Sequence, residues 1–199
     1  FDANTWQQLS TFSIQETVKY ADFKKDGSEV LITLVNNDES HLSRRSLKDG
    51  SILSTLDRVE RTALDGSSFL LSYKSAFYSN DGKSMILLTD DEIRKISLED
   101  HQVLFEEKIG TTSTLNKPLV ESENGDRLAV NSYSKILILN GESGETIDEV
   151  SFGDLDLKYF TYNAEQNMVA GFGEAGIYSI WKDKVITDDR LYLGGDSTF

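Results

Sequence analysis

The feature that most constrains this chain is an internal repeat. Four stretches each combine an apolar strand, a tight turn and a second apolar strand; they cover residues 20–34, 75–89, 118–132 and 159–173. Their turns fall at Asp26-Gly27, Asp81-Gly82, Asn124-Gly125 and Glu165-Gln166. Asp-Gly and Asn-Gly favour hairpins, since Gly and Asn tolerate the positive φ that such turns require. Each stretch is therefore predicted to be a β-hairpin.

A second pattern follows each hairpin. An alternating strand closes on a large apolar residue, and a polar turn then leads to another strand. We expect the closing residues to be equivalent and buried; they are Leu47, Leu98, Leu139 and Trp181. Alternation with period two and many Thr, Val, Ile and Tyr residues are typical of strands. Each unit is thus predicted to have four strands, over approximately 17–56, 72–108, 116–150 and 158–187.

The spacing of the units indicates the architecture. The copies recur at intervals of roughly 40 to 55 residues, which is close to the period of a β-propeller blade. An extra stretch, Asp57 to Ser72, lengthens the first interval, and Val59 to Leu64 within it is predicted to be a short helix or a loop. We predict an all-β, β-propeller-like array of about four four-stranded antiparallel blades, in a single domain spanning residues 1–199.

The repeated unit resembles the divergent WD-repeat and YVTN-type β-propeller families over nearly the whole chain. Trp181 with Lys182-Asp183 lies near the place where WD repeats have Trp-Asp. Leucine takes the place of that Trp in the other copies, and the Gly-His pair of WD repeats is absent. The resemblance implies an architecture more than a function.

The two ends suggest further strands. Leu9 to Ile14 is predicted to be a lone strand, and Leu191 to Leu193 the opening strand of a fifth unit. Four units with two such strands indicate part of a larger ring. The terminal sheet faces would then be covered by further blades of a parent chain or by self-association, because apolar faces are unfavourable in water.

Composition excludes several classes of partner and chemistry. The chain has 20 Lys and Arg against 34 Asp and Glu, a formal net charge of −14. Nucleic acids and anionic membrane surfaces require basic patches, so neither is expected as a partner. No apolar run is long enough for direct membrane insertion. The absence of cysteine excludes disulfides, thiolate zinc sites and a cysteine nucleophile. The sequence does not indicate a cellular compartment.

One stretch matches a nucleotide-binding motif literally. Gly171 to Gly176 reads G-x-G-x-x-G, but pyrophosphate binding needs a helix after the glycines. The following residues, Ile177 to Trp181, are strand-like. We therefore interpret the stretch as a glycine-rich hairpin between two strands.

Other candidate groups lack the spacing that catalysis or metal binding requires. His41 and His101 belong to no recognised ligand or triad motif, and Ser143 lacks the G-x-S-x-G frame of a nucleophile elbow. Acidic runs at 89–92, 153–156 and 187–189 could supply oxygen ligands to Ca²⁺, but their spacing does not match an EF-hand. We interpret them as solvated surface. No residue is predicted to be catalytic, cofactor-binding or metal-ligating.

The leading functional hypothesis is a non-catalytic propeller module or scaffold that binds a protein or peptide partner and uses no cofactor. It rests on the resemblance in fold, and fold alone does not determine function. Two alternatives stay open. One is an extracellular sensor or a structural domain of a surface protein. The other is a propeller enzyme with its site in the central channel.

Overall fold

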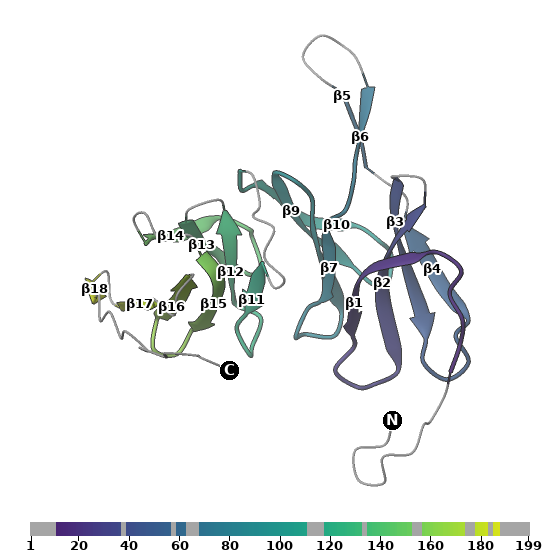
Figure 1. The fold of residues 1–199 in the computed structure, drawn as a ribbon, viewed down its shortest axis with the longest axis horizontal. Helices are drawn as coiled ribbons and strands as arrows, with labels where there is room; N and C mark the ends of the chain where they lie inside the picture. The colour runs from purple at the N-terminus through teal and green to yellow at the C-terminus, as the bar shows by residue number, and fades with distance from the viewer. Residues whose placement is uncertain are drawn as a thin grey trace, which may run out of the picture. The chain divides into compact units, whose positions relative to one another are not determined.

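The computed structural model describes residues 11–36, 39–56, 59–62, 68–110, 118–132, 135–152, 157–173, 178–182 and 185–187. These residues form strands joined by turns and include no helix. The chain divides into two compact units, Phe1–Lys108 and Ile109–Phe199 (Figure 1). The prediction of an all-β chain is confirmed for the part that the structure describes.

The first unit contains two four-stranded antiparallel sheets, each a meander in which consecutive strands pair. Sheet 1 consists of β1 (Thr17–Phe23), β2 (Glu29–Asn36), β3 (Glu39–Ser46) and β4 (Ile52–Leu56). Sheet 2 consists of β7 (Ser75–Tyr78), β8 (Ser84–Leu88), β9 (Glu92–Ser97) and β10 (Val103–Lys108).

The stretch between these sheets is a separate hairpin. Strands β5 (Val59–Thr62) and β6 (Ser68–Leu71) pair with each other, Val59 opposite Leu71 and Thr62 opposite Ser68. The prediction of a short helix or a loop is therefore wrong over Val59 to Thr62, and residues 63 and 64 lie outside the described residues. Strands of four residues are too short a window for periodicity to separate a strand from a helix or a loop.

The second unit repeats the arrangement with two more meanders. Sheet 3 consists of β11 (Leu119–Glu121), β12 (Arg127–Ser132), β13 (Lys135–Asn140) and β14 (Thr146–Ser151). Sheet 4 consists of β15 (Leu157–Asn163), β16 (Met168–Gly173), β17 (Tyr178–Lys182) and β18 (Val185–Thr187). Four four-stranded antiparallel sheets are therefore present, as the repeat predicted.

The first turn of each of the four sheets uses a residue with positive φ. Gly27, Gly82 and Gly125 have φ of 70°, 66° and 75°. In the fourth copy this position belongs to Asn167, with φ of 46°, and not to Gln166 as the sequence alignment implied. Asn is the side chain that tolerates this region best after Gly, so the turn survives without its glycine.

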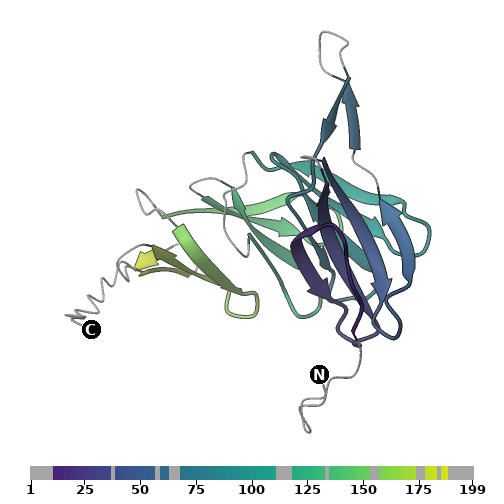
Figure 2. The same cartoon turned by 45° about the vertical axis from the view of Figure 1, so that its right-hand side comes forward.

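The two sheets of the first unit pack face to face (Figure 2). Buried side chains from both sheets form one cluster: Leu31, Leu42, Tyr73, Ala76, Tyr78, Met85, Leu87 and Ile96. Tyr20 of β1 meets Phe77 of β7 edge to face, with ring centroids 5.0 Å apart. A four-stranded sheet has two faces, and this contact buries one face of each sheet.

The second unit has a corresponding core. Ala129, Ile136, Ile138 and Val150 of sheet 3 pack with Phe152 and with Leu157, Phe160, Tyr162 and Val169 of sheet 4. Gly171 lies against this cluster so closely that an added Cβ would be 2.6 Å from Leu157 Cδ2 and 3.2 Å from Phe152 Cε2. Packing inside β16 therefore requires a glycine at position 171.

The predicted equivalence of the closing apolar residues is partly wrong. Three backbone N–H groups just after the third strand donate equivalent hydrogen bonds to the residue just before the second strand: Leu47 to Ser28 O, Leu98 to Lys83 O and Gly141 to Asp126 O, at 2.9, 2.9 and 2.7 Å. The third-copy equivalent of Leu47 and Leu98 is therefore Gly141, and Leu139 lies two residues earlier. Leu139 is fully buried, whereas Leu47 and Leu98 are partly buried. The side chain of Trp181 lies outside the described residues.

A close backbone approach explains the glycine of the third copy. A Cβ on Gly141 would lie 1.9 Å from the carbonyl oxygen of Gly125. No side chain fits there without moving the turn, so the sequence substitutes Gly where the first two sheets have Leu. An alignment based on apolar residues shifted to Leu139 for this reason.

The face of sheet 1 that points away from sheet 2 is covered by the chain that precedes β1. Val30, Ile32 and Leu34 form the buried surface of this face, and Phe12, Ile14 and Leu47 pack partly buried against it. Residues 11–15 form no ladder pairing, so the predicted lone strand is wrong over Thr11 to Ile14. Leu9, Ser10 and the predicted strand at Leu191 to Leu193 lie outside the described residues.

The outer strands of three sheets share one irregularity. The register skips Leu53 of β4, Leu104 of β10 and Ile147 of β14. Each skipped residue is an aliphatic side chain that is about half exposed, at 47%, 52% and 51%. A bulge on an edge strand bends it and disturbs its unpaired backbone groups, which hinders pairing with another chain.

The contact of Phe12 can be tested through Gly50. A Cβ on Gly50 would lie 2.6 Å from Phe12 Cβ and Cγ, whereas a Cβ on Gly82 meets nothing within 4 Å. Both glycines have positive φ, 74° and 66°. Gly50→Ala and Gly82→Ala should each lose about 1–2 kcal/mol of unfolding free energy to backbone strain. Gly50→Ala should lose a further ~1–3 kcal/mol, because Phe12 must move. Urea unfolding measures the difference; equal losses would show that Phe12 does not lie on Gly50.

Candidate functional site

A groove lined mainly by apolar residues lies on the covered face of sheet 1, and we call it the sheet-1 groove. Its volume is about 1070 Å³. It is lined by Thr11, Phe12, Ile14, Val18, Ala21, Phe23, Gly27, Ser28, Val30, Ile32, Ser46, Leu47 and Lys48. All of these belong to sheet 1, its turns and the segment preceding it, so the described lining comes from one compact unit.

The groove has a floor and two walls. Val30 and Ile32 of β2 are buried and form the floor. Phe12 and Ile14, which pack against that floor, form one wall. Side chains of β1 form the other wall, and two of them are unusually exposed for apolar residues: Val18 at 45% and Phe23 at 63%. The strand that borders the groove thus presents apolar surface to solvent.

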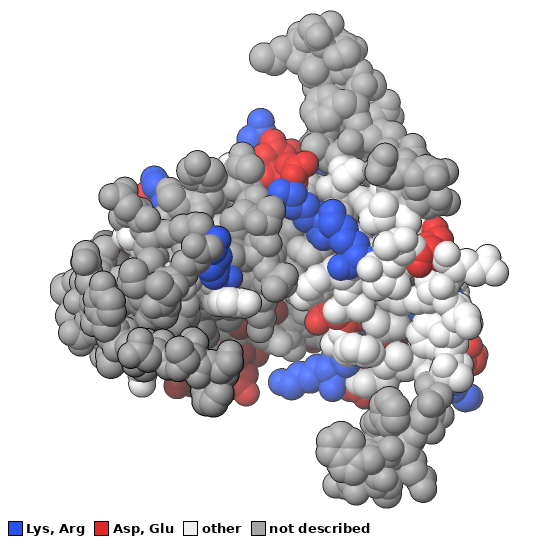
Figure 3. All heavy atoms as spheres, viewed as in Figure 1, with Lys and Arg blue, Asp and Glu red and all other residues white. Residues whose placement is uncertain are grey.

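The charge of the lining differs from that of the chain. The chain carries 34 carboxylates and a net charge of −14, yet among the described residues that line the groove there is no Asp or Glu, and Lys48 is the one charged side chain. In Figure 3 the surface of the first unit is mostly white toward the side where β2–β4 lie in Figure 1, with red and blue at its margins. The arrangement suits an apolar ligand that is neutral or acidic at its ends.

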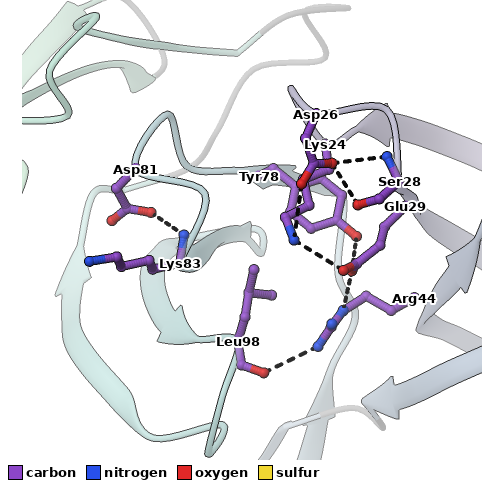
Figure 4. Close-up of polar contacts among 9 residues, drawn as sticks. All are labelled: Lys24, Asp26, Ser28, Glu29, Arg44, Tyr78, Asp81, Lys83 and Leu98. Carbon is purple, nitrogen blue, oxygen red and sulfur yellow. Dashed lines mark hydrogen bonds and ion pairs between the residues drawn. The ribbon is translucent and has the colours of Figure 1, made fainter.

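A polar cluster fastens the opposite face of sheet 1 to sheet 2 (Figure 4). The Glu29 carboxylate of β2 accepts hydrogen bonds from Arg44 Nε at 2.9 Å, Lys24 Nζ at 3.1 Å and the Tyr78 hydroxyl at 3.2 Å. Arg44 also donates from Nη1 to the carbonyl oxygen of Leu98 at 3.2 Å. Tyr78 and Leu98 belong to sheet 2, so the cluster crosses between the sheets.

A second contact reinforces this junction. The backbone N–H of Tyr78 donates to Asp22 Oδ2 of β1 at 2.7 Å. At the edge of the cluster, Asp26 accepts from the backbone N–H and hydroxyl of Ser28 and lies 3.7 Å from Lys24 Nζ. The charged groups bind one another, and the cluster therefore acts as a clamp between the sheets.

The pKa values of the cluster follow from its geometry. Burial raises the pKa of Glu29, but hydrogen bonds and charges from Arg44 and Lys24 outweigh burial and lower it overall. Burial and then the Glu29 charge raise the pKa of Tyr78. Glu29 is therefore ionised and Tyr78 protonated at neutral pH, which is the combination that the hydrogen bond between them requires.

The second unit has a related contact with the opposite charge. Arg127, the first residue of β12, donates from Nη1 to the Tyr162 hydroxyl and to Asn167 Oδ1, both at 3.4 Å. Glu29 and Arg127 occupy the start of the second strand in their sheets, and each contacts a tyrosine of the following sheet. The first residue of the second strand thus joins the two sheets in both compact units, as a carboxylate in the first unit and as a guanidinium in the second.

Neither histidine lies in a catalytic arrangement within the described residues. His41 of β3 has Nε2 3.4 Å from Glu16 Oε1. His101 is exposed and has φ of 58° in the turn before β10, where sheets 1 and 3 have Gly50 and Gly144 at φ of 74° and 77°. Its role in the turn is conformational.

The structure also places the serine and the glycine-rich stretch. Gly171 to Gly173 are the last residues of β16. Tyr178, the first residue of β17, pairs with Phe172, so the glycine-rich stretch connects two antiparallel strands. Residues 174–177 lie outside the described residues. Ser143 lies in the turn between β13 and β14 and donates its backbone N–H to Asn140 Oδ1.

The acidic runs make ordinary ion pairs where they are described. Asp90 pairs with Lys74 at 2.7 Å, and Glu92 with the buried Arg94 at 3.3 Å. Within the described part of the chain no three His, Asp or Glu side chains gather as metal ligands would. The runs at 153–156 and 188–189 lie outside it. The described residues also contain no helix with the length and hydropathy to cross a membrane.

Sequence reasoning missed both the groove and the clamp. The groove arises because residues 11–15 cover only part of a sheet face. A single sequence does not show how much of a sheet face such a segment buries. The clamp unites residues from β2, β3 and β7, which only tertiary packing brings together. One signal was present: Thr11 to Gln15 alternates polar and apolar residues, and such alternation is typical of a chain lying on an apolar surface.

Glu29→Gln should weaken the clamp in a pH-dependent way. Glu29 and Arg44 are 14% and 15% exposed, and losing one charge from such a pair should cost roughly 1–3 kcal/mol at pH 7. Because the folded pKa of Glu29 lies below its unfolded value, its contribution exists above pH of about 4.3 and disappears as the pH falls through the folded pKa. Urea unfolding at pH 7 and pH ~3 measures this.

Asp90→Asn serves as the control for Glu29→Gln. Its pair with Lys74 is 65% and 30% exposed, so less than ~1 kcal/mol should be lost at pH 7. If both variants lose the same stability, or if the Glu29→Gln loss persists at low pH, the clamp does not stabilise the contact between the sheets.

His101→Gly should stabilise the protein by about 0.5–1 kcal/mol. Glycine removes the strain of positive φ, and this gain exceeds the entropy that it adds to the unfolded chain. Gln102→Gly is the control, since Gln102 is an exposed neighbour without positive φ and should gain nothing. Thermal and urea unfolding compare the two. A loss of stability in His101→Gly would reveal a contact of the imidazole that the turn geometry does not include.

No protein-family model matches this chain, and no curated protein compared with it is a significant match.

Proposed function

We propose that this protein is a non-catalytic binding module, built as a β-propeller-type array of four-stranded blades, which binds a protein or peptide partner. The stacking inside each unit supports the architecture. The first strands of successive sheets lie close together, β1 with β7 and β11 with β15. In propellers, consecutive four-stranded blades stack around a channel, and their first strands are neighbours.

The sheet-1 groove carries the functional part of the proposal. Its volume of about 1070 Å³ is near the upper end of ligand-binding sites, roughly 300–1,000 Å³. Exposed apolar surface that continues from a groove is typical of interaction sites. Phe23, at 63% exposed, is the kind of aromatic side chain that dominates binding to protein partners.

The polar groups favour binding over catalysis. Small-molecule sites converge a few polar groups on one ligand, whereas the groove offers two serines, one threonine and Lys48 along an apolar surface. Elsewhere in the first unit, Glu29, Arg44 and Tyr78 bind one another across the two sheets. Their chemistry serves the junction between the sheets.

Selection from a displayed random-peptide library against the full chain tests the function. Peptides should be enriched, and they should lose binding to Phe23→Ser but keep binding to Phe172→Ser. Phe172 is a matched control, since it is 41% exposed on a strand of the second unit. Absence of any enriched peptide, or equal binding to both variants, would contradict a binding function at the groove.

A further inference from the structure

We propose that the sheet-1 groove binds an extended segment of a protein partner, with apolar side chains at alternate positions, lying beside the chain's own Thr11–Gln15. This inference rests on the proposed binding function and specifies its ligand. The occupant is a partner segment of about five residues that is neutral or acidic.

The chain itself shows what this sheet face accepts. From Thr11 to Gln15, exposed residues alternate with partly buried ones, and the partly buried ones are Phe12 and Ile14. Both pack against Val30, Ile32 and Leu34. An extended chain projects alternate side chains to one side, so two apolar residues separated by one polar residue can contact the same flat face.

Side chains alone fix this segment within the described residues. No hydrogen bond of residues 11–15 occurs there, and the first polar anchor is the contact between Glu16 and His41. Phe12 lies so close to Gly50 that an added Cβ would be 2.6 Å from it. The face therefore recognises apolar side chains by shape and needs no backbone pairing.

The groove continues this binding surface toward β1. Phe12 and Ile14 form one of its walls, and Val18 and Phe23 lie on the opposite wall. Val18 and Phe23 pair with Leu34 and Val30, which are four residues apart on β2, and this corresponds to roughly 13 Å. An extended segment of about five residues spans this distance and places two or three apolar side chains between the two walls, beside Val18 and Phe23.

Charge restricts the partner further. The part of the lining that the structure describes contains Lys48 and no carboxylate, although the chain as a whole has a net charge of −14. The excess of carboxylates elsewhere would attract a basic segment to other surfaces, whereas Lys48 favours an acidic end at the groove. Since a short apolar segment without backbone pairing gains little beyond its side chains, we expect a Kd of roughly 0.1–1 mM.

Two synthetic peptides of one composition test the inference on the full chain: DFSISVD, in which apolar residues alternate, and DSSFIVD, in which they are adjacent. Amide chemical shifts of the ¹⁵N-labelled protein report the site and the affinity. DFSISVD should shift amides of β1 and of Val30 to Ile32 and bind at least ~5-fold more tightly than DSSFIVD. Phe23→Ser should weaken it by a similar factor, and Phe172→Ser should leave it unchanged.

The outcomes separate this inference from the proposed function. Equal binding of both peptides at the groove would overturn the extended, alternating ligand and leave a binding module. If neither peptide at ~1 mM shifts the amide resonances of the groove, while library peptides still bind there, the extended, alternating ligand would also be overturned and the binding function would stand. A dimer that Phe23→Ser abolishes would replace the partner by a second copy. Contacts between Trp6 and Phe23 would show that the chain's own first residues, and not a partner segment, occupy the groove.

Discussion

The structure depends on the contact between the two sheets of each unit. A four-stranded meander has two faces and cannot bury either alone, so it must pack on a neighbour. In the first unit, Leu31 and Leu42 of sheet 1 meet Met85 and Leu87 of sheet 2, and all four are essentially inaccessible to solvent. This apolar contact fixes which faces remain for other purposes, and the sheet-1 groove exists because the second face of sheet 1 has no such partner sheet in its unit.

The polar clamp adds direction to that contact. Apolar packing is non-directional and would tolerate a shifted sheet. Glu29 accepts one hydrogen bond from Arg44 of its own sheet and one from Tyr78 of the next sheet. Both hydrogen bonds can form together only when the two sheets lie in this one position relative to each other. In the second unit Arg127 makes the corresponding contact with Tyr162. Opposite charges serve the same position, because a tyrosine hydroxyl can donate to a carboxylate and accept from a guanidinium.

The sequence allowed the strands and turns to be predicted but not the tertiary relations. Asp-Gly turns identify hairpins because positive φ is a local requirement, and Gly27 and Gly82 satisfy it as expected. Leu139 was misaligned because the property that matters at its neighbour Gly141 is an approach of Gly125 O, a contact with no local signature. The groove was unpredictable for a related reason, since it depends on how far a covering segment extends over a sheet.

The covering of sheet 1 illustrates a general consequence of leaving a sheet face without a partner sheet. Val30, Ile32 and Leu34 are 3%, 3% and 0% exposed, so residues 11–15 and Leu47 complete most of the burial that a neighbouring sheet would provide. A single extended segment is narrower than a sheet, and the surplus face appears at the wall formed by Val18 and Phe23. Replacing these two side chains by polar ones would remove the exposed apolar surface at little cost to the core. Their exposure is therefore the observation on which the proposed binding of an apolar chain at this face rests.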